Sequence, residues 1–350
     1  MRWDSLRLDD GQSDDVAAPR APALFGRDAV ARTFDTPGFR GMTFYEVHAK
    51  SIINRVPEAS RVPFRWTINP YRGCGHSCTY CFARNTHTYL DMDAGNDFNT
   101  QIVVKVNAPE LARRELASSR WQGEHVAMGT NVDCYQRAEG RYQLMPGIIG
   151  ALRDAANPFS ILTKGTLILR DLDLLCDAAG VTDVGLNVSV GFVDKAISRS
   201  VEPGTPSPER RLAVCAAITG RGLRCGVLMG PVLPFLTDSS AQLEQTVRLA
   251  AEAGAAHISP IVLHLRPGAR EWFLRWLHET HPELSDRYRD LYARGAYAPK
   301  AYQERISNQV AELAARYRVG RASPVQARRI RPRPSQRAAS PPAPVQLTLL

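Results

Sequence analysis

Three cysteines within eight residues constrain this chain more than any other feature. Cys74, Cys78 and Cys81 have the spacing C-x3-C-x2-C, and the aromatic Tyr80 stands directly before the third cysteine. The next cysteine, Cys134, lies far along the chain and has no paired neighbour. Three thiolates on one short loop can hold three corners of a four-iron cluster and leave the fourth iron open to a ligand. We therefore predict that these three cysteines bind a [4Fe-4S] cluster.

Two other interpretations of this loop are weaker. A zinc site with His76 as the fourth ligand would be crowded, because His76 lies between two of the cysteines. Unliganded core cysteines stand in apolar segments, as Cys176, Cys215 and Cys225 do. The loop around Cys74 is instead polar and contains glycine, which suits a backbone wrapped closely around an inorganic core.

Composition and charge indicate one enzyme-sized domain with tails. The 350 residues are 44% hydrophobic, and no run of apolar residues is long enough to span a membrane. The odd number of cysteines, three of them in the loop, argues against a disulfide framework and predicts a cytoplasmic protein. Of the net charge of +9, seven positive charges come from arginines after residue 317, where no acid or lysine occurs. The body of the chain is therefore close to neutral.

Strand and helix patterns alternate from about residue 65 onward, which is typical of an α/β fold with a parallel sheet. The expected strands are near-continuous apolar runs, as in strands buried on both faces. They cover 66–69, 102–106, 125–130, 159–164, 184–191, 225–232 and 258–265. Helix starts are predicted at Asn107, Ser207 and Ser239, and three C-terminal helices over 267–279, 284–294 and 299–317 are expected to pack on the barrel as a lid or at its side.

The chain divides into four predicted parts. Residues 1–60 form an N-terminal arm, and residues 61–317 form the core with its C-terminal helices. Residues 318–345 are rich in Arg and Pro and poor in apolar residues, so we predict a disordered linker. Residues 346–350 form a separate terminal peptide.

Polar residues follow several of the expected strands, at the edge where α/β folds collect their chemistry. Lys164 ends one apolar strand, and a buried ammonium is costly unless it meets an anion or solvent. Asn131, Asp133 and Ser189 stand at comparable positions, where short polar residues also cap helices. Arg199 and Glu202 are interpreted as a structural pair that holds a loop.

From about residue 69 to 232 the chain resembles the spore photoproduct lyase-like branch of the radical S-adenosylmethionine (SAM) superfamily, also described as DNA repair photolyase-like. The resemblance rests on the cysteine loop and, in the same order along the chain, on residues 104–107, 130–133, 163–164, 202–205 and 226–231. It implies a partial (β/α)6 barrel with a [4Fe-4S] cluster. It also implies that an external one-electron reductant drives cleavage of SAM to a 5′-deoxyadenosyl radical, and that the substrate is nucleic acid. By position, the residues implied to contact SAM are Tyr80, Asn131, Lys164 and Ser189.

One position departs from this family. Spore photoproduct lyase has a hydrogen-donating cysteine just before its strand-end motif, and Gly129 occupies that position here. Cys134 lies five residues later, and nothing in the sequence gives it that role. We therefore expect a substrate other than the spore photoproduct, with nucleic acid as the leading class: another lesion or a modified nucleotide, and a protein as the alternative. Non-enzymatic alternatives are an iron–sulfur redox sensor or electron relay recruited through the tail, and an adaptor with a structural cluster.

The C-terminal peptide resembles the short clamp-binding peptides of bacterial DNA-processing proteins. Its relevant residues are Gln346, Leu347, Leu349 and Leu350. A glutamine can hydrogen-bond at the mouth of an apolar groove that the leucines fill, and a semi-extended linker would hold the peptide clear of the core. The sequence thus predicts a sliding clamp as a partner, and a terminal peptide without such a role is the alternative.

Overall fold

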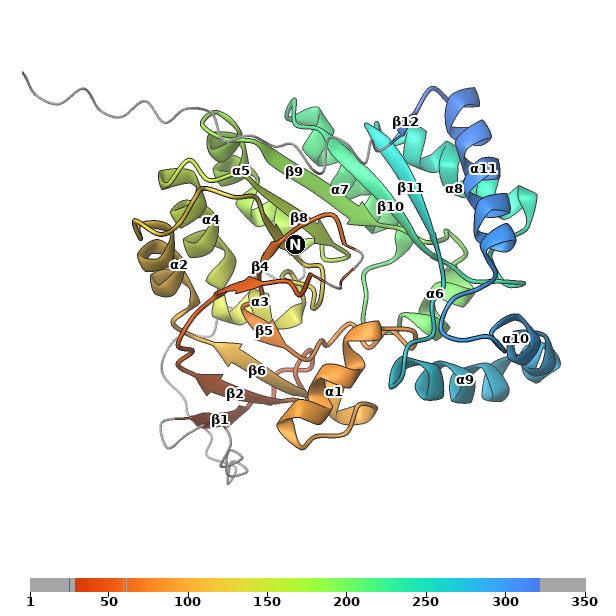
Figure 1. The fold of residues 1–350 in the computed structure, drawn as a ribbon, viewed down its shortest axis with the longest axis horizontal. Coiled ribbons are helices and arrows are strands. Elements are labelled where there is room, and N and C mark those ends of the chain that lie inside the picture. Colours follow the sequence, from red (N-terminus) through yellow and green to blue (C-terminus); the bar gives the residue numbers. More distant parts are fainter. Residues whose placement is uncertain (1–24, 26–28, 59, 61, 322–350) are drawn as a thin grey trace, which may run out of the picture.

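The computed structural model describes residue 25 and residues 29–58, 60 and 62–321. Its centre is an eight-stranded sheet in the order β12-β11-β10-β9-β8-β7-β4-β3. These strands are β3 (Ile53–Arg55), β4 (Trp66–Ile68), β7 (Val126–Met128), β8 (Phe159–Thr163), β9 (Val184–Ser189), β10 (Cys225–Val232), β11 (His257–Val262) and β12 (Gly320–Arg321). All neighbours are parallel except β3 and β4. The strands from β4 to β11 follow one another in chain order, which confirms the partial (β/α)6 barrel (Figure 1).

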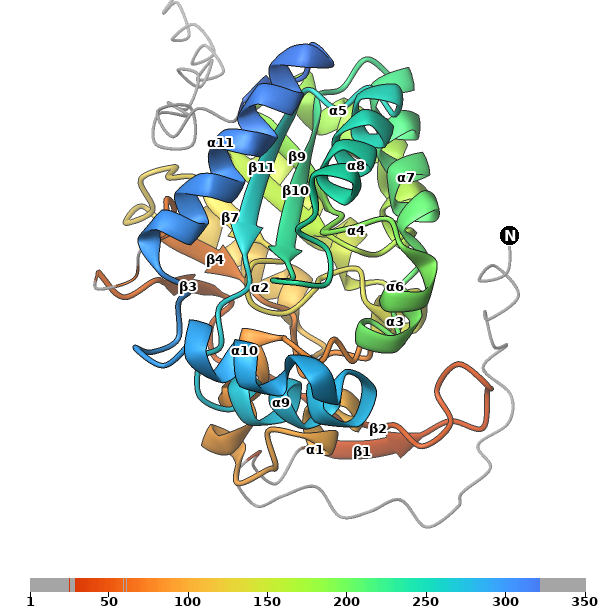
Figure 2. The ribbon, with the colours of Figure 1, turned by 90° about the vertical axis from the view of Figure 1, so that its right-hand side faces the viewer.

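The connecting helices cover the outside of this sheet, as Figure 2 shows for its last strands. The main ones are α2 (Ala108–Leu116), α4 (Leu144–Asp154), α5 (Leu172–Ala179), α7 (Pro208–Gly220), α8 (Ser240–Glu252) and α11 (Lys300–Arg316). Shorter helices are α1 (Asn96–Thr100), α3 (Arg137–Tyr142) and α6 (Lys195–Val201), with the 3-10 helices η3 (Phe82–Leu90), η4 (Leu167–Asp171) and η5 (Pro282–Leu284). Their apolar faces and the buried strands form one continuous core.

A second sheet lies at the carboxyl ends of the barrel strands and corrects one expectation. It has four strands in the order β1-β2-β6-β5, namely β1 (Val30–Thr33), β2 (Thr43–Val47), β6 (Gln101–Lys105) and β5 (Tyr71–Arg72). The run predicted over 102–106 is β6, so it pairs with β2 of the N-terminal arm and not with the barrel. An apolar run predicts a buried strand but does not say which strand lies beside it.

The predicted helix starts are right, although one cap differs. Ser207 and Ser239 accept hydrogen bonds from backbone amides in the first turns of α7 and α8. Asn107 precedes α2 but makes no capping bond. Its side-chain oxygen instead accepts from the amide of Ala49 at 2.9 Å, and its amide donates to the Ala49 carbonyl at 3.0 Å. Asn107 therefore joins the N-terminal segment to the barrel.

The C-terminal helices divide between two places. Helix α11 packs against β11 and α8 as an outer helix of the barrel. Helices α9 (Ala269–Thr280) and α10 (Ser285–Leu291) lie beyond the carboxyl ends of β10 and β11, and α9 contacts η3 (Figure 2). Within the range predicted as a linker from residue 318, Gly320 and Arg321 form β12 beside β11. The rest of the linker and the peptide Gln346–Leu350 lie outside the described residues.

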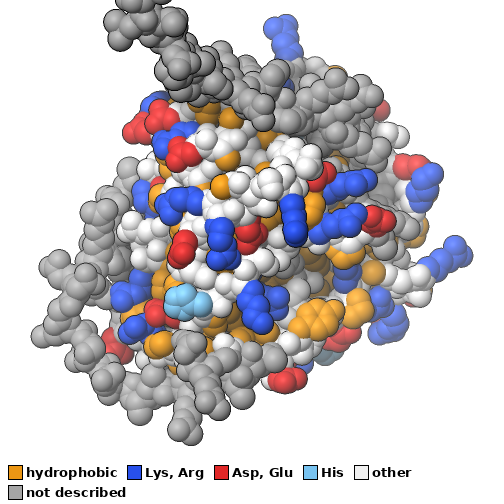
Figure 3. Space-filling view, turned by 60° about the vertical axis from the view of Figure 1, so that its left-hand side comes forward, with side chains coloured by type: hydrophobic (Ala, Val, Ile, Leu, Met, Phe, Trp, Pro, Cys, Tyr) orange, Lys and Arg blue, Asp and Glu red, His pale blue; other side chains and the backbone are white. Residues whose placement is uncertain are grey.

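Two further features concern the charge on one face of the molecule and the length of the helices. Figure 3 shows Lys and Arg side chains interspersed with Asp and Glu over one face of the molecule. None of the helices in the described part of the chain combines the length and apolar character needed to cross a bilayer.

Candidate active site at the carboxyl ends of the strands

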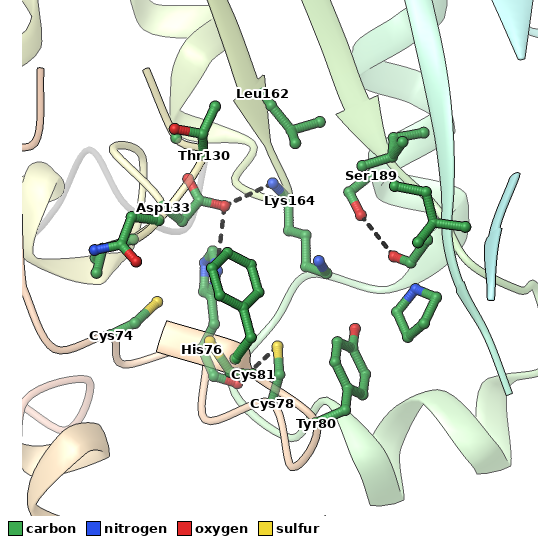
Figure 4. Close-up of a pocket in the computed structure, with 18 of the residues that line it drawn as sticks. Cys74, His76, Cys78, Tyr80, Cys81, Thr130, Asp133, Leu162, Lys164 and Ser189 are labelled. Carbon is green, nitrogen blue, oxygen red and sulfur yellow. Dashed lines mark hydrogen bonds and ion pairs between the residues drawn. The ribbon is translucent and has the colours of Figure 1, made fainter. Parts of the chain in front are cut away.

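All seven residues predicted as cluster or SAM ligands line one pocket at the carboxyl ends of the barrel strands. The pocket is lined by Cys74, Cys78, Tyr80, Cys81, Asn131, Lys164 and Ser189, among others. Figure 4 shows the three cysteines on one side, with Thr130 and Leu162 on the opposite side. Parallel strands end at the same edge of a sheet, which is why residues so distant in sequence meet here.

The cysteine loop begins directly after β5 and is held by backbone contacts. Gly73 has a φ of +79°, and a Cβ atom there would press against the carbonyl oxygen of Gln101 in β6. The amide of Cys74 donates to the carbonyl of Phe98 at 2.9 Å. The buried Gln136 accepts from the amide of Gly75 at 3.0 Å and donates to the carbonyl of Gly73 at 2.9 Å. The chain thus fixes the loop without any bound group.

A buried arginine supports the other half of the loop. Arg84 is fully buried, and its Nε and Nη2 atoms donate to the carbonyl of Cys78 at 3.2 and 2.9 Å. Its Nη1 atom donates to the carbonyl of Gly95 at 2.7 Å, and its guanidinium lies 4.8 Å from the ring centroid of Trp272. The cost of burying a guanidinium is small when its N–H groups are hydrogen-bonded in this way. Arg84 therefore places a positive charge beside the cysteine loop.

The chemistry of the three thiols fits a positively charged inorganic group. Burial raises the pKa of Cys78 to about 12, although the nearby Lys164 and Arg211 oppose that rise. Burial also raises the pKa of Cys74 and of Cys81. Thiols in such a place ionise when a metal compensates their charge.

The thiolates of a cluster bind different irons, so their sulfur atoms lie farther apart than the ligands of a single zinc ion. Within the described residues, no three His, Cys, Asp or Glu side chains converge closely enough to bind one metal ion. The cluster assignment of the three cysteines stays a prediction.

Asp133 connects the cysteine loop to two strand ends. Its carboxylate accepts from the Thr163 hydroxyl at 2.7 Å, from the Lys164 amide at 2.7 Å and from the Tyr135 amide at 2.9 Å, and it lies 3.4 Å from Nδ1 of His76. Burial alone would raise the pKa of Asp133, but His76 and these hydrogen bonds outweigh it and lower that pKa to about 2. Both carboxylate oxygens are used by residues around the pocket, so the role of Asp133 is to position those residues.

The side chains of Lys164 and Asn131 are not held in this way by other described residues. The Lys164 side chain points into the pocket (Figure 4), where its ammonium lies 5.7 Å from the ring centroid of Tyr80. Among the described residues, no carboxylate lies within ion-pair distance of that ammonium and no side chain hydrogen-bonds Asn131. Ser189 donates to the carbonyl of Gly230 at 3.0 Å and keeps its acceptor lone pairs. These side chains can receive the polar atoms of a small anionic ligand.

A buried network replaces the predicted pair of Arg199 and Glu202. Glu202 pairs instead with Arg211 of α7, both side chains being 1% exposed, and it also accepts from the hydroxyl of Tyr80. Arg211 donates to the carbonyl of Ser189 at 3.0 Å. The network therefore links the cysteine loop to the end of β9.

The loop after Glu202 also packs directly on the cysteine loop. The amide of Gly204 donates to the carbonyl of His76 at 3.0 Å, and a Cβ atom at Gly204 would collide with the carbonyl oxygen of Gly75. Sequence reasoning missed Arg84, Gln136 and Arg211. The sequence context of Arg84 and Arg211 carried little signal, because each lies in a helical segment that also contains other polar residues.

Cys134 does not face the pocket. It is 1% exposed, and it is absent from the residues that line the pocket. Burial raises its pKa, and the neighbouring Asp133 and Glu139 add to that effect. Gly129 does line the pocket, with a φ of +74°, and a Cβ atom there would collide with the carbonyl oxygen of Leu162 in β8. This backbone excludes a cysteine at position 129 unless β8 moves.

Comparisons with known proteins agree with this geometry. The sequence model of the Radical SAM superfamily matches residues 68–250. An uncharacterized protein of Mycobacterium tuberculosis is 49% identical over 321 residues, which cover 91% of this chain and 93% of that protein. An uncharacterized protein of Methanocaldococcus jannaschii is 28% identical over 195 residues, which cover 55% of this chain and 69% of that protein.

Solved structures show the same fold at low sequence identity. Spore photoproduct lyase complexed with dinucleoside spore photoproduct has a TM-score of 0.57 and 15% identity, over 78% of this chain and 79% of that chain. A mutant of that lyase with bound AdoMet and the dinucleoside has a TM-score of 0.55 and 15% identity, over 74% of this chain and 76% of that chain. At this level of identity the likeness establishes the architecture.

Proposed function

Because the chain belongs to the radical SAM superfamily and is an enzyme of that type, we propose that it repairs or modifies nucleic acid. When bound, the cluster and SAM supply a 5′-deoxyadenosyl radical at the expense of an electron from an external reductant. The chain's own residues bind these groups, orient the substrate and keep water away from the reacting atoms.

The observation that carries this proposal is the meeting of three thiols, two buried and one half-buried, with the ammonium of Lys164 in one pocket. We assign Cys74, Cys78 and Cys81 to the cluster. We assign Lys164 to the carboxylate of SAM, and the polar side chains of Asn131 and Ser189 to its other polar atoms. We assign Tyr80, which donates to Glu202, to the neighbourhood of the adenine.

Two observations support nucleic acid as the substrate class. The fold is that of spore photoproduct lyase, and solved structures of that lyase contain a dinucleoside photoproduct. The seven arginines after residue 317 would add a salt-dependent attraction to phosphates.

The test is anaerobic reconstitution with iron, sulfide, SAM and dithionite, followed by mass spectrometry of 5′-deoxyadenosine. We expect product formation that increases when DNA or RNA oligonucleotides are added and does not increase with a protein digest. A yield that nucleic acid leaves unchanged would contradict the substrate class. A cluster that changes oxidation state reversibly without cleaving SAM would favour the alternative, a redox sensor or electron relay.

The spore photoproduct itself is not the proposed substrate. Its repair in the family needs a cysteine where Gly129 stands, and the backbone at that position leaves no room for a side chain. Cys134 is buried away from the pocket. Incubation of the reconstituted enzyme with the dinucleoside spore photoproduct should therefore yield no repaired thymines, and efficient repair would overturn this part of the proposal.

The C-terminal peptide is proposed to bind a sliding clamp through Gln346, Leu347, Leu349 and Leu350. The support is its sequence alone, because these residues lie outside the described part of the chain. Deletion of residues 346–350 should abolish binding to the clamp while iron content and SAM cleavage stay unchanged. A full-length protein without clamp affinity at low salt would show that the peptide has another role.

A further inference from the structure

A layered group of planar side chains lies at the mouth of the pocket. His264 stacks on Tyr297 with ring centroids 5.5 Å apart and planes inclined by 28°. Phe82 also lies close to His264, with centroids 5.9 Å apart and planes inclined by 39°. The guanidinium of Arg266 lies 5.7 Å from the Phe82 centroid and 6.0 Å from the Tyr297 centroid, and it donates to the Tyr297 hydroxyl at 2.8 Å. We call these four residues the aromatic rim.

The backbone fixes the aromatic rim in place. An isolated β-bridge joins His264 to Tyr297, and the amide of Leu265 donates to the carbonyl of Ala296 at 2.7 Å. Arg270 at the start of α9 donates to the carbonyl of Gly295 at 3.3 Å. Two segments distant in sequence, 264–270 and 293–300, therefore form one rigid edge. A rigid edge favours binding, because little conformational entropy is lost when a ligand binds to it.

Two rings of the aromatic rim are exposed to solvent. Phe82 is 37% exposed and Tyr297 is 43% exposed. Phe82 and His264 also line the pocket, and Phe82 directly follows the third cysteine, Cys81. A group stacked on the rim would therefore sit at the entrance to the site where the radical chemistry is proposed to occur.

The charge around the aromatic rim suits an anionic polymer. The segments 264–270 and 293–300 contain no Asp or Glu, and their cations are Arg266, Arg270, Arg294 and Lys300, of which Lys300 pairs with Glu304. Rigid aromatic faces beside arginines are the usual platform for unpaired nucleobases, because every base has a face to stack and every nucleotide has a phosphate. A polypeptide would offer neither an aromatic ring at each residue nor a regular negative charge.

We propose that the aromatic rim stacks an unpaired nucleobase of the substrate and presents the neighbouring nucleotide to the pocket. The proposal rests on the proposed function and makes it specific, since it predicts preference for single-stranded or locally opened nucleic acid over intact duplex. Enzymes that act on a base must take it out of the stack, and a fixed platform lowers the cost of doing so.

The test measures binding of labelled single-stranded and duplex oligonucleotides by fluorescence anisotropy, with the reconstituted holoenzyme and SAM present. We expect tighter binding of the single strand, weakened at least about fivefold by Tyr297→Ala and by Phe82→Ala. Phe82→Tyr keeps the ring and should keep the affinity. Tyr89→Ala is the matched control, because Tyr89 is an exposed aromatic of η3 (72%) outside the rim.

The outcomes separate the two proposals. Weaker nucleic-acid binding in both alanine variants, with SAM affinity and iron content preserved, supports the rim as the platform. Wild-type protein that binds no nucleic acid overturns the proposed function, and the rim proposal falls with it. Wild-type binding that Tyr297→Ala does not weaken overturns the rim proposal alone. Loss of SAM affinity in Tyr297→Ala with unchanged nucleic-acid binding also overturns it, since the rim would then serve the cofactor.

Discussion

The two ends of the barrel strands differ in how their polar groups are satisfied. At the amino ends, Trp66 and Trp121 pack edge to face with centroids 5.2 Å apart, and their indole groups donate to Glu124 and, at 2.7 Å, to Asn157. Asn157 in turn donates to the carbonyl of Glu124 at 3.1 Å. At the carboxyl ends, Asp133 and the Glu202–Arg211 pair are similarly satisfied, but they surround side chains that have no partner.

This difference identifies the functional end of the molecule. Polar groups that satisfy one another need no ligand and stabilise the fold. An ammonium such as that of Lys164, half-buried and outside ion-pair distance of any carboxylate among the described residues, costs free energy that a ligand can recover. Substitutions at the carboxyl ends should therefore affect the binding of ligands, and substitutions at the amino ends should affect the stability of the fold.

The largest expected effect is loss of the cluster. Replacement of Cys74, Cys78 or Cys81 by Ala should remove essentially all cluster iron and its visible absorbance, because each thiolate holds a different corner. Iron analysis and absorption spectroscopy of anaerobically reconstituted protein measure this. Cys176→Ala, at a half-buried position in α5, is the matched control and should retain its iron.

The other non-loop cysteines sharpen this test. Cys134, Cys215 and Cys225 are buried in the core, so their replacement by Ala should lower stability and still leave the iron content per folded molecule unchanged. A folded variant at any of these positions that cannot bind the cluster would show that the assignment of ligands is wrong.

The next largest effect concerns SAM. Lys164→Ala removes the one unpaired ammonium proposed to meet the SAM carboxylate, and a charge-assisted bond contributes about 1.5–3 kcal/mol. SAM affinity, measured by calorimetry on the reconstituted protein, should fall roughly tenfold or more with the iron content preserved. Lys195→Ala is the control, since Lys195 is an exposed lysine paired with Glu209 and should not change the affinity. Equal affinities in the two variants would place Lys164 outside the SAM site.

The sequence predicted the parts of the molecule that depend on local chemistry or on strand order. The cysteine spacing is local, and Lys164 and Ser189 meet the cysteines because neighbouring parallel strands end together. The partner of β6 could not be predicted, because an apolar run carries no information about its neighbour.

The supports of the site were missed for a related reason. Arg211 satisfies Glu202 through tertiary contact, and a charged residue in a helix looks solvent-exposed until its face is known. Asn107 shows the same limit, since its sequence position indicates a helix cap while its side chain bonds to Ala49.

At the amino ends, Asn157→Ala should affect stability alone. Asn157 is 2% exposed, and its loss leaves the Trp121 indole without its acceptor, at an expected cost of about 1–3 kcal/mol in the free energy of unfolding. Chemical denaturation of the variant measures this cost, and SAM affinity should equal that of the wild type. A variant with wild-type stability and weaker SAM binding would reverse the proposed division between the two ends.

The smallest expected effect is a pH dependence that arises from His125, the residue before β7. Burial lowers the pKa of His125 to about 4, from the model-compound value of 6.5. Neither ring nitrogen has a hydrogen-bond partner within the described residues. Between these two pH values the unfolded chain binds a proton that the folded chain does not bind, so stability falls as the pH falls. The expected loss is about 0.7 kcal/mol from pH 7 to pH 6 and about 2 kcal/mol by pH 5.

His125→Leu removes the titrating group and should make the unfolding free energy flatter over this range, and SAM affinity at pH 7 should not change. Denaturation of both proteins at pH 7, 6 and 5 measures the difference between their slopes. Identical slopes would mean that the ring of His125 reaches water in the folded protein. Water would then satisfy the one unpartnered ring among the described residues of the amino end, and the contrast with the carboxyl end, based on the bonds of the tryptophans and Asn157, would be sharper.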